Sequence, residues 1–422
     1  MARYFLIYDE PLNAGASFAR RSLGPLTTGG VRQSIFTLIS AAIGGGTLCL
    51  PYVFSLTGLV IGILMICFAG FLAFITMRML LVSAERLQVY SYGKLFSEGV
   101  NMRYSGICVD SVMILFGFGV VTAYFVFLGD FIPSLIESVC SYSLSRELCI
   151  VMCCISAIPF AVPEKLSTLQ YITPLSTLSL IITSVVVAYR TPEMHSEIPS
   201  GSSELQILYF ENSYSVLKAF AIVTSAFICH TNVVSVAGEL VSPTDTRATK
   251  VAFRSAIVQV ILYISIATCG YISFGGSIQQ NFIRNYPAND PLISLCRVFL
   301  SLTIFFGLPI NTNPTAKSFL SIYNSINESS NSSDHMNRRL RIICGVALLI
   351  VGASVSLVVP GIADVVSFIG GSLGALIMLV FPTLIYTSVF RSEMTERFDK
   401  ISVVLAFISA LACLTYVFAS VW

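Results

Sequence analysis

Charged residues are spaced along this chain so that long apolar segments lie between them. About 20 apolar residues are enough to cross the hydrocarbon core of a bilayer. The interval from Arg32 to Arg78 contains no charge and has room for two such segments, with Gly58 between them. Single segments fit the intervals Arg103–Asp130, Glu147–Glu164, Lys165–Arg190, Lys218–Glu239, Arg254–Arg284 and Arg297–Lys317. Two more lie between Arg341 and Arg391, interrupted around Pro360, Gly361 and Asp364, and the last follows Lys400. The pattern predicts eleven membrane-spanning helices, the fourth being the shortest.

The composition agrees with this interpretation. Of 422 residues, 55% are hydrophobic and 11% are charged, a balance that a soluble chain of this size could not cover with a polar surface. The net charge of +2 indicates no strong field for nucleic acid. We therefore expect an all-α, multi-pass integral membrane protein that contacts the lipid bilayer and binds no nucleic acid.

The distribution of Lys and Arg predicts the orientation, because positive residues are retained in cytoplasmic loops. With a cytoplasmic N-terminus, nineteen of the twenty-four Lys and Arg residues lie inside. The C-terminus is then extracellular or lumenal. Residues 1–32 read as a short cytoplasmic tail rather than a cleavable signal, since Asp9, Glu10 and Pro11 interrupt the early apolar run. The sequence leaves open whether the membrane is the plasma membrane or a vacuolar or lysosomal one.

The first apolar segment contains an unusual glycine run, "SAAIGGGTLCLPY" at residues 40–52. Non-helical backbone at membrane depth is tolerated only where it lines a cavity or is buried in protein. Gly44, Gly45 and Gly46, with Pro51 shortly after, would unwind the helix and leave N–H groups at the positive end of the following half-helix, which suits a carboxylate. Small residues that let two helices approach closely are the alternative explanation.

A second interruption is expected in the sixth segment, "AFICHTNVVSVAGEL" at residues 226–240. His230, Thr231 and Asn232 lie in mid-segment, where polar groups are costly and often functional, and Gly238 and Glu239 follow. Corresponding breaks in the two halves of a membrane protein are the best sequence indicator of a transporter's binding site. The first and sixth segments therefore predict one site between them.

These motifs resemble the amino acid/auxin permease family, and within it the neutral amino acid transporter branch. Two further stretches carry the resemblance, "CGYISFGGSIQQNFIRNYP" at 269–287 and "FFGLPINTNPTAKSF" at 305–319. The resemblance covers about residue 30 to the end. It implies the 5+5 inverted-repeat fold of sodium-coupled leucine transporters plus one C-terminal helix. The repeats would be about 33–189 and 213–390 within a transporter domain 33–422, with the eleventh helix at about 401–421.

The resemblance also implies an amino acid substrate held between the first and sixth segments. Backbone groups on one side and side chains on the other would contact it: Ile43, Gly44, Gly45, Gly46, Thr47, Tyr124, Phe227, Cys229, His230, Thr231 and Asn232. His230 could instead satisfy a carbonyl freed by the break, or sense pH. Glu239 is a gating candidate, although a solvated helix-end carboxylate is an equal alternative. Asn311, Thr312 and Asn313 either line the inner vestibule or end the eighth helix.

The coupling ion is where the chain departs from part of this family. Sodium-coupled members resemble one another in placing an Asn before the glycines and a Thr in the eighth helix, whereas this chain has Ser40 at the first position and Thr303 half a turn from the second. Fewer side-chain oxygens weaken a site for a hard cation. We therefore expect H⁺ coupling, with Na⁺ coupling as the alternative and Ser40, Thr303 and His230 as coupling-ion candidates.

Other functional classes fit the sequence less well. The apolar segments lack the paired carboxylates or the nucleophile and base that an intramembrane hydrolase needs, so we expect no enzyme, no cofactor and no metal site. A membrane amino acid sensor of the same fold remains an alternative to a transporter, and a channel or scaffold is less consistent with polar residues concentrated at two breaks. A neutral substrate is favoured because the expected walls contain no acid. A Cys140–Cys149 disulfide stays open.

Overall fold

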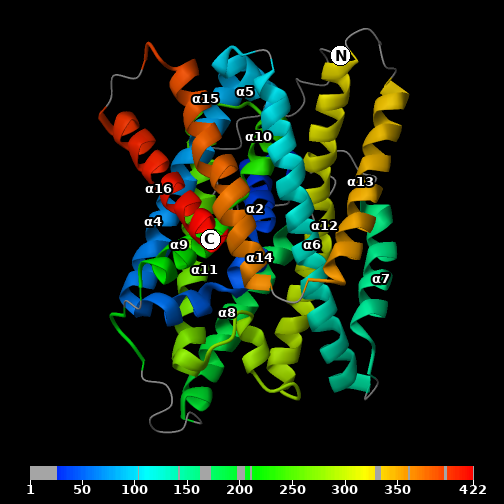
Figure 1. Ribbon diagram of the computed structural model, residues 1–422, viewed down its shortest axis with the longest axis vertical. Helices are drawn as coiled ribbons and strands as arrows, with labels where there is room; N and C mark the ends of the chain where they lie inside the picture. The colour runs from blue at the N-terminus through cyan, green and yellow to red at the C-terminus, as the bar shows by residue number, and fades with distance from the viewer. Residues whose placement is uncertain are drawn as a thin grey trace, which may run out of the picture.

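The computed structural model describes residues 26–102, 104–140, 143–161, 173–196, 205–209, 212–327, 334–359, 362–393 and 397–421. In these ranges the chain forms helices joined by loops and has no strand (Figure 1). Most of the N-terminal tail, residues 1–25, lies outside the described residues, as do Pro360 and Gly361. The side chains of Cys140 and Asp364 lie outside them too.

The first membrane span is made of three pieces. It begins with α2 (Val31–Ala42), continues through α3 (Gly45–Leu48) and ends in the first part of α4 (Leu50–Leu87). Within α4 the backbone leaves helical geometry at Gly58, where φ is 75°, and a Cβ there would lie 2.7 Å from the amide nitrogen of Tyr209. A side chain would therefore be both strained and obstructed. The predicted boundary between spans one and two at Gly58 is confirmed.

The remaining elements follow in the predicted order. They are α5 (Tyr92–Val100), α6 (Ser105–Cys140), α7 (Arg146–Ala157) with a 3₁₀ turn η1 (Ile158–Ala161), α8 (Thr173–Ser196), α9 (Ser213–Ala226), α10 (His230–Glu239), α11 (Asp245–Phe274), the turns η3 (Gly275–Ser277) and η4 (Phe282–Asn285), α12 (Pro291–Ile326), α13 (Asp334–Ser356), α14 (Ile362–Ile369), the π-helical turns η5 (Gly370–Gly374) and η6 (Leu376–Val380), α15 (Phe381–Val389) and α16 (Arg397–Val421). Spans six and ten are thus each assembled from more than one element.

Nine helices in the described part of the chain are long and apolar enough to cross a membrane. The fourth predicted span is represented by α7, whose 12 residues are too few by themselves. The first span is broken, and its final piece and the second span together form α4. The protein is an all-helical multi-pass membrane protein, and the count of eleven stays a prediction.

The eighth span is longer than the sequence indicated. Helix α12 has 36 residues and continues through Pro309 and Pro314, so Asn311, Thr312 and Asn313 do not end it. Proline is tolerated inside membrane helices when side chains of the same region bond the backbone. Here Asn311 Nδ2 donates to the Gly307 carbonyl at 3.1 Å, and the Thr315 hydroxyl donates to the Asn311 carbonyl at 2.9 Å.

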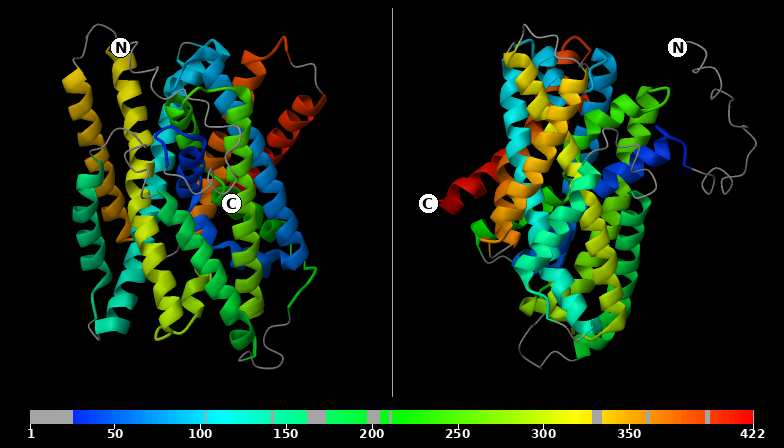
Figure 2. Two further views of the ribbon diagram at one scale, coloured as in Figure 1. Left: turned by 180° about the vertical axis from the view of Figure 1, so that it is seen from behind. Right: turned by 90° about the vertical axis from the view of Figure 1, so that its right-hand side faces the viewer.

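The broken first span lies inside the helix bundle. Helix α2 packs against α8, α10, α11 and α12, and Leu38 and Ile39 on it are buried. Around it, α4 pairs with α11 and α6 pairs with α12. The right-hand view of Figure 2 shows α16 slanting away from the bundle. Helix α2, which leads into the glycine run, is therefore enclosed by other helices.

The start of α12 is held by one carboxylate. Asp290 caps the helix by accepting hydrogen bonds from the backbone amides of Leu292 and Ile293, at 2.9 and 3.3 Å. It also pairs with Arg190 of α8 at 2.8 Å. Burial raises the pKa of Asp290, but these hydrogen bonds outweigh burial and hold the pKa below its usual value. The pair ties the ends of α8 and α12 together.

The N-terminal end of α2 is clasped to the end of α10. The backbone N–H of Val241 donates to the Gly29 carbonyl at 2.9 Å, and the Gly29 N–H donates to the Gln33 side chain at 2.5 Å. Gly29 has φ 71°, and a Cβ on it would collide with the carbonyl of Glu239. This contact, which we call the Gly29 clasp, joins the N-terminal end of span one to the C-terminal end of span six.

We expect Gly29→Ala to open the clasp. The left-handed conformation costs a residue with a Cβ roughly 1–2 kcal/mol, and the collision with Glu239 adds to that cost. The melting temperature of the detergent-purified protein should fall. Gly276→Ala is the matched control because a Cβ at Gly276 meets no atom within 4 Å. Equal melting temperatures for the two variants would show that the clasp contributes nothing.

Candidate functional site

The interruptions of spans one and six lie against each other. Helix α2 ends at Ala42 and α3 begins at Gly45, while α9 ends at Ala226 and α10 begins at His230. A Cβ on Gly46 would lie 2.7 Å from the Cα of Ala226, so only glycine permits this approach. The carbonyl of Ala226 is bonded at 2.9 Å by the hydroxyl of Tyr263 from α11. The two breaks thus form one site.

The break in span one leaves backbone donors unused. The first amide bonded inside the new helix is that of Thr47, which donates to the Gly44 carbonyl at 3.1 Å. The amides of Gly45 and Gly46 make no hydrogen bond to any other described residue. They lie at the positive end of the following half-helix, where an anion is stabilised. A carboxylate is the group that these amides suit.

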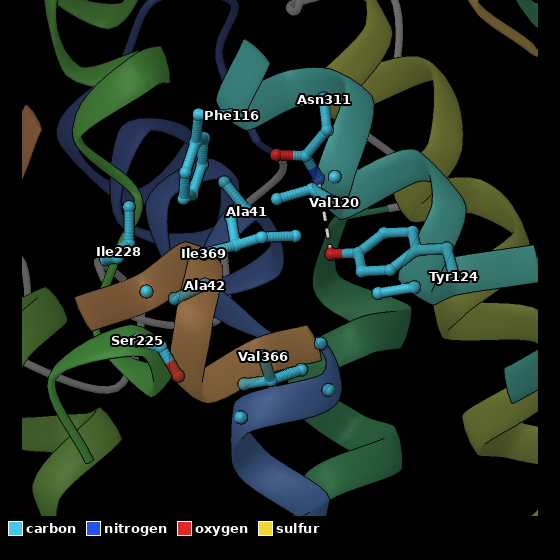
Figure 3. Close-up of a pocket in the computed structure, with 16 residues that line it drawn as sticks. Ala41, Ala42, Phe116, Val120, Tyr124, Ser225, Ile228, Asn311, Val366 and Ile369 are labelled. Carbon is cyan, nitrogen blue, oxygen red and sulfur yellow. Dashed lines mark hydrogen bonds between the residues drawn. The ribbon is translucent and has the colours of Figure 1, made fainter. Parts of the chain in front are cut away.

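A cavity of about 50 Å³ lies beside the breaks (Figure 3). By comparison, about 10–15 Å³ is needed to hold one water. Its walls come from spans one, three, six, eight and ten: Ala41, Ala42, Gly44, Gly45, Gly46, Phe116, Gly119, Val120, Ala123, Tyr124, Ser225, Ile228, Asn311, Val366, Ile369 and Gly370. None of these side chains is charged. The cavity suits a small ligand without net side-chain charge.

Tyr124 of α6 connects three spans at the cavity wall. Its hydroxyl donates to the Ile43 carbonyl at 2.9 Å and accepts from Asn311 Nδ2 at 3.2 Å. Its ring lies directly on two glycines, because a Cβ on Gly44 or Gly307 would come within 2.8 or 2.7 Å of it. The hydroxyl therefore satisfies a carbonyl that the broken helix leaves without an intrahelical partner.

Span ten closes the cavity beside α6, because a Cβ on Gly119 of α6 would collide with Ile369 of α14. A Cβ on Gly45 would lie 2.6 Å from Val366 Cγ2 of α14 and 2.9 Å from a ring atom of Phe127. Gly370, the first residue of the π-helical turn η5, lies so close to Ser225 that a Cβ would collide with it. π-Helical turns inside helices often occur at functional sites. The glycines of both spans keep the walls close together.

The cavity brings together some of the predicted substrate-binding residues. Gly44, Gly45, Gly46 and Tyr124 line it, and the Ile43 carbonyl is held at its edge by Tyr124. Thr47 is buried but is not part of the wall. Their contact with a substrate stays a prediction.

The residues predicted in span six face other helices. The ring of Phe227 packs on Tyr263, with 5.0 Å between centroids, and Cys229 Sγ lies 3.4 Å from the sulfur of Met77. Asn232 donates to the neighbouring Thr231 hydroxyl at 3.2 Å. None of these four residues is on the cavity wall, to which span six instead contributes Ser225 near the end of α9 and Ile228 within the break.

His230 is buried and bonded to span two. Its Nε2 lies 2.8 Å from the Thr76 hydroxyl, which itself donates to the Leu72 carbonyl at 2.8 Å. The Thr76 oxygen must then accept from Nε2–H, leaving Nδ1 as an acceptor. Nδ1 has no partner among the described residues. His230 therefore faces span two and is not part of the cavity wall.

The coupling-ion candidates lie at two places. The Ser40 hydroxyl donates to the Ser176 hydroxyl of α8 at 2.9 Å, and Thr303 of α12 is buried with no partner for its oxygen in the described ranges. The described residues contain no group of three His, Cys, Asp or Glu side chains able to hold a metal ion. Cys149 is a free buried thiol, 3.6 Å from the Leu128 carbonyl.

Sequence reasoning missed most of the α6 wall and all of span ten, and it named Asn311 of span eight only as one of two alternatives. Phe116, Gly119, Val120 and Ala123 precede Tyr124 at the spacing that places residues on one face of a helix. Extending that face from Tyr124 would have found them. Val366 and Gly370 carry no such local signal, because only the packing of span ten brings them to the cavity.

Comparisons with known proteins agree with this fold. Residues 27–422 match the family described as transmembrane amino acid transporter protein. AAT1 of Toxoplasma gondii is 31% identical over 321 residues, 75% of this chain and 44% of that protein. The vacuolar amino acid transporter 5 of Schizosaccharomyces pombe is 25% identical, covering 85% of this chain and 84% of the relative. The chain spans about half the length of the AAT1 relatives it matches.

One further relative and two solved structures are also similar to this chain. The sodium-coupled neutral amino acid transporter 7 of Xenopus laevis is 23% identical, covering 87% of this chain and 82% of the relative. The structure of Mhp1, a nucleobase-cation-symport-1 family transporter, superposes with a TM-score of 0.61 at 13% identity, covering 93% and 92% of the two chains. MhsT in complex with L-phenylalanine superposes with a TM-score of 0.53 at 13% identity, covering 92% and 98%. The leucine-transporter-like fold is confirmed, and the named relatives are transporters.

We expect Tyr124→Phe to destabilise the site without changing its shape. The change leaves the Ile43 carbonyl and one Asn311 N–H without their partner, and an unsatisfied buried group costs about 1–3 kcal/mol. The melting temperature in detergent should fall relative to Tyr189→Phe, which removes a hydroxyl from an exposed side chain. An unchanged melting temperature would mean that the Tyr124 hydroxyl does not hold the break.

Proposed function

Because the chain belongs to the transmembrane amino acid transporter family, we propose that it carries neutral amino acids across its membrane by alternating access, coupled to protons. The observation that carries this proposal is the uncharged cavity beside the free amides of Gly45 and Gly46. A zwitterion fits such a site, since a carboxylate suits the amides and an ammonium suits the carbonyls that end α2. Alternating access would require spans one and six to move relative to the rest of the bundle.

The neutral specificity rests on the walls of the cavity. They contain no Asp, Glu, Lys, Arg or His to balance a charged side chain. A buried unpaired charge is too costly to bind well. The name of the Xenopus laevis relative, a neutral amino acid transporter, supports the same substrate class.

Proton coupling is supported by the surroundings of two coupling-ion candidates, Ser40 and His230. The Ser40 hydroxyl is engaged with Ser176, and a sodium ion needs several oxygens at once. His230 is the buried imidazole beside the break in span six, and its Nδ1 is without a partner among the described residues. An imidazole can take up and release a proton at physiological pH when it gains access to water.

Sodium coupling is the second candidate. The unpartnered oxygen of Thr303 could join a cation site, and a relative is named as sodium-coupled. We further propose an N-terminus in the cytoplasm, as the distribution of Lys and Arg indicates. Vacuolar relatives make an intracellular organelle as suitable a location as the plasma membrane.

The test is uptake of labelled neutral amino acids into proteoliposomes. We expect a pH gradient to drive uptake and a sodium gradient to be dispensable. Gly45→Val should reduce uptake at least about tenfold, because a displacement of about 1 Å at a binding site can cost a hundredfold, and the new side chain would meet Val366 and Phe127. Gly276→Ala is the control that should transport normally.

The outcomes separate the parts of the proposal. Uptake that requires sodium, and falls in Thr303→Val but not in His230→Gln, would contradict proton coupling and keep transport. Absence of uptake of every neutral amino acid, with binding still measurable, would contradict transport and favour a sensor.

A further inference from the structure

Asn311 of α12 presents an unused hydrogen-bond acceptor to the cavity. Both hydrogens of its amide are engaged, since Nδ2 donates to the Tyr124 hydroxyl at 3.2 Å and to the Gly307 carbonyl at 3.1 Å. Exchanging the amide oxygen and nitrogen would set two acceptors against each other at Gly307. The orientation of the Asn311 amide is therefore fixed by its neighbours.

The oxygen of this amide is open to the cavity. Asn311 lines the cavity, and its Oδ1 accepts no hydrogen bond from a described residue. The hydroxyl oxygen of the neighbouring Thr312 is fully buried, whereas a water molecule in the cavity can reach Oδ1 of Asn311. Figure 3 shows the oxygen turned away from the Tyr124 hydroxyl, on the side of Phe116.

The other polar side chains of the wall have also used their hydrogens. The Tyr124 hydroxyl donates to Ile43, and the Ser225 hydroxyl donates to the Ile222 carbonyl at 2.6 Å. Only oxygen lone pairs remain on these groups. The side chains of the wall therefore offer acceptors and no spare donor, and the free donors of the site are backbone amides of the glycine run.

Asn311 and the amides of Gly45 and Gly46 belong to different parts of the cavity wall. Figure 3 shows Asn311 and Val366 at opposite ends, with Ala41 and Ala42 between them. Gly45 lies beside Val366, because a Cβ on it would approach Val366 Cγ2 to 2.6 Å. A carboxylate held by the glycine amides would leave the rest of its amino acid extending toward Asn311.

We propose that Asn311 is a specificity-determining residue whose Oδ1 accepts a hydrogen bond from the side chain of the substrate. The site then prefers small uncharged amino acids whose side chain carries an O–H or N–H donor over apolar side chains of the same shape and over side-chain carboxylates. This inference rests on the proposed function, because it takes the carboxylate of an amino acid to lie at Gly45 and Gly46.

The test compares threonine with valine, which differ by one hydroxyl in place of a methyl group. Apparent affinities are measured by competition for uptake in proteoliposomes and by ligand-induced thermal shift of the purified protein. One hydrogen bond predicts that threonine binds about fivefold more tightly than valine. Asn311→Leu keeps a similar shape, removes the acceptor and should bring the ratio to one or invert it. Thr312→Val, which alters a buried neighbour off the cavity wall, should keep the wild-type ratio.

Each result decides one question. Equal affinities for threonine and valine in the wild-type protein would overturn the inference while transport stands, and this comparison holds even if Asn311→Leu fails to fold. An equal loss for both substrates in Asn311→Leu would also overturn it, because Asn311 would then contact a group that both share. A threonine preference in thermal shift with no uptake at all would support the role of Asn311 and contradict the proposed transport.

Discussion

The structure depends on satisfying backbone groups where two membrane spans stop being helical. In the bilayer core an unpaired N–H or C=O costs several kcal/mol, so a broken helix survives only where protein or ligand supplies partners. Span one is broken at Ile43 and Gly44, and span six between Ala226 and His230. Tyr124 and Tyr263 each donate to one freed carbonyl. The amides of Gly45 and Gly46 have no partner among the described residues, and the proposed substrate carboxylate would supply one.

Close approach of the surrounding helices follows from the same requirement. For its hydroxyl to reach the break in span one, the ring of Tyr124 must lie directly on the backbone, and Gly44 and Gly307 allow this because they have no Cβ. Gly46 and Gly370 do the same against Ala226 and Ser225. Tight packing limits the cavity to about 50 Å³ and leaves few polar atoms on its wall. Polarity and size are thus set together, because the close packing that lets Tyr124 reach the break also limits the volume of the cavity.

The cavity and the Gly29 clasp lie at the two ends of one short helix. Helix α2 runs from the clasp with the end of α10 to the break beside the cavity, and it is only 12 residues long. A rigid segment of this kind can transmit movement from one end to the other, since a helix turns as a unit about its ends. The clasp and the cavity wall are therefore joined by one continuous helix.

The sequence by itself determined the class of protein, the break at the glycine run and the boundary at Gly58, because apolar length and glycine runs are local features of the chain. It could not determine which way His230, Cys229 and Phe227 point, since the unwound residues between α9 and α10 do not follow helical periodicity. It left open whether Asn311 lines a cavity or ends its helix, and it did not predict that Val366 and Gly370 complete the wall. Asn311 lies on the wall because α12 continues beyond Pro309, and Gly370 begins a π-helical turn of span ten. The tertiary structure decided these positions, because the partner of each polar group lies on a helix far away in sequence.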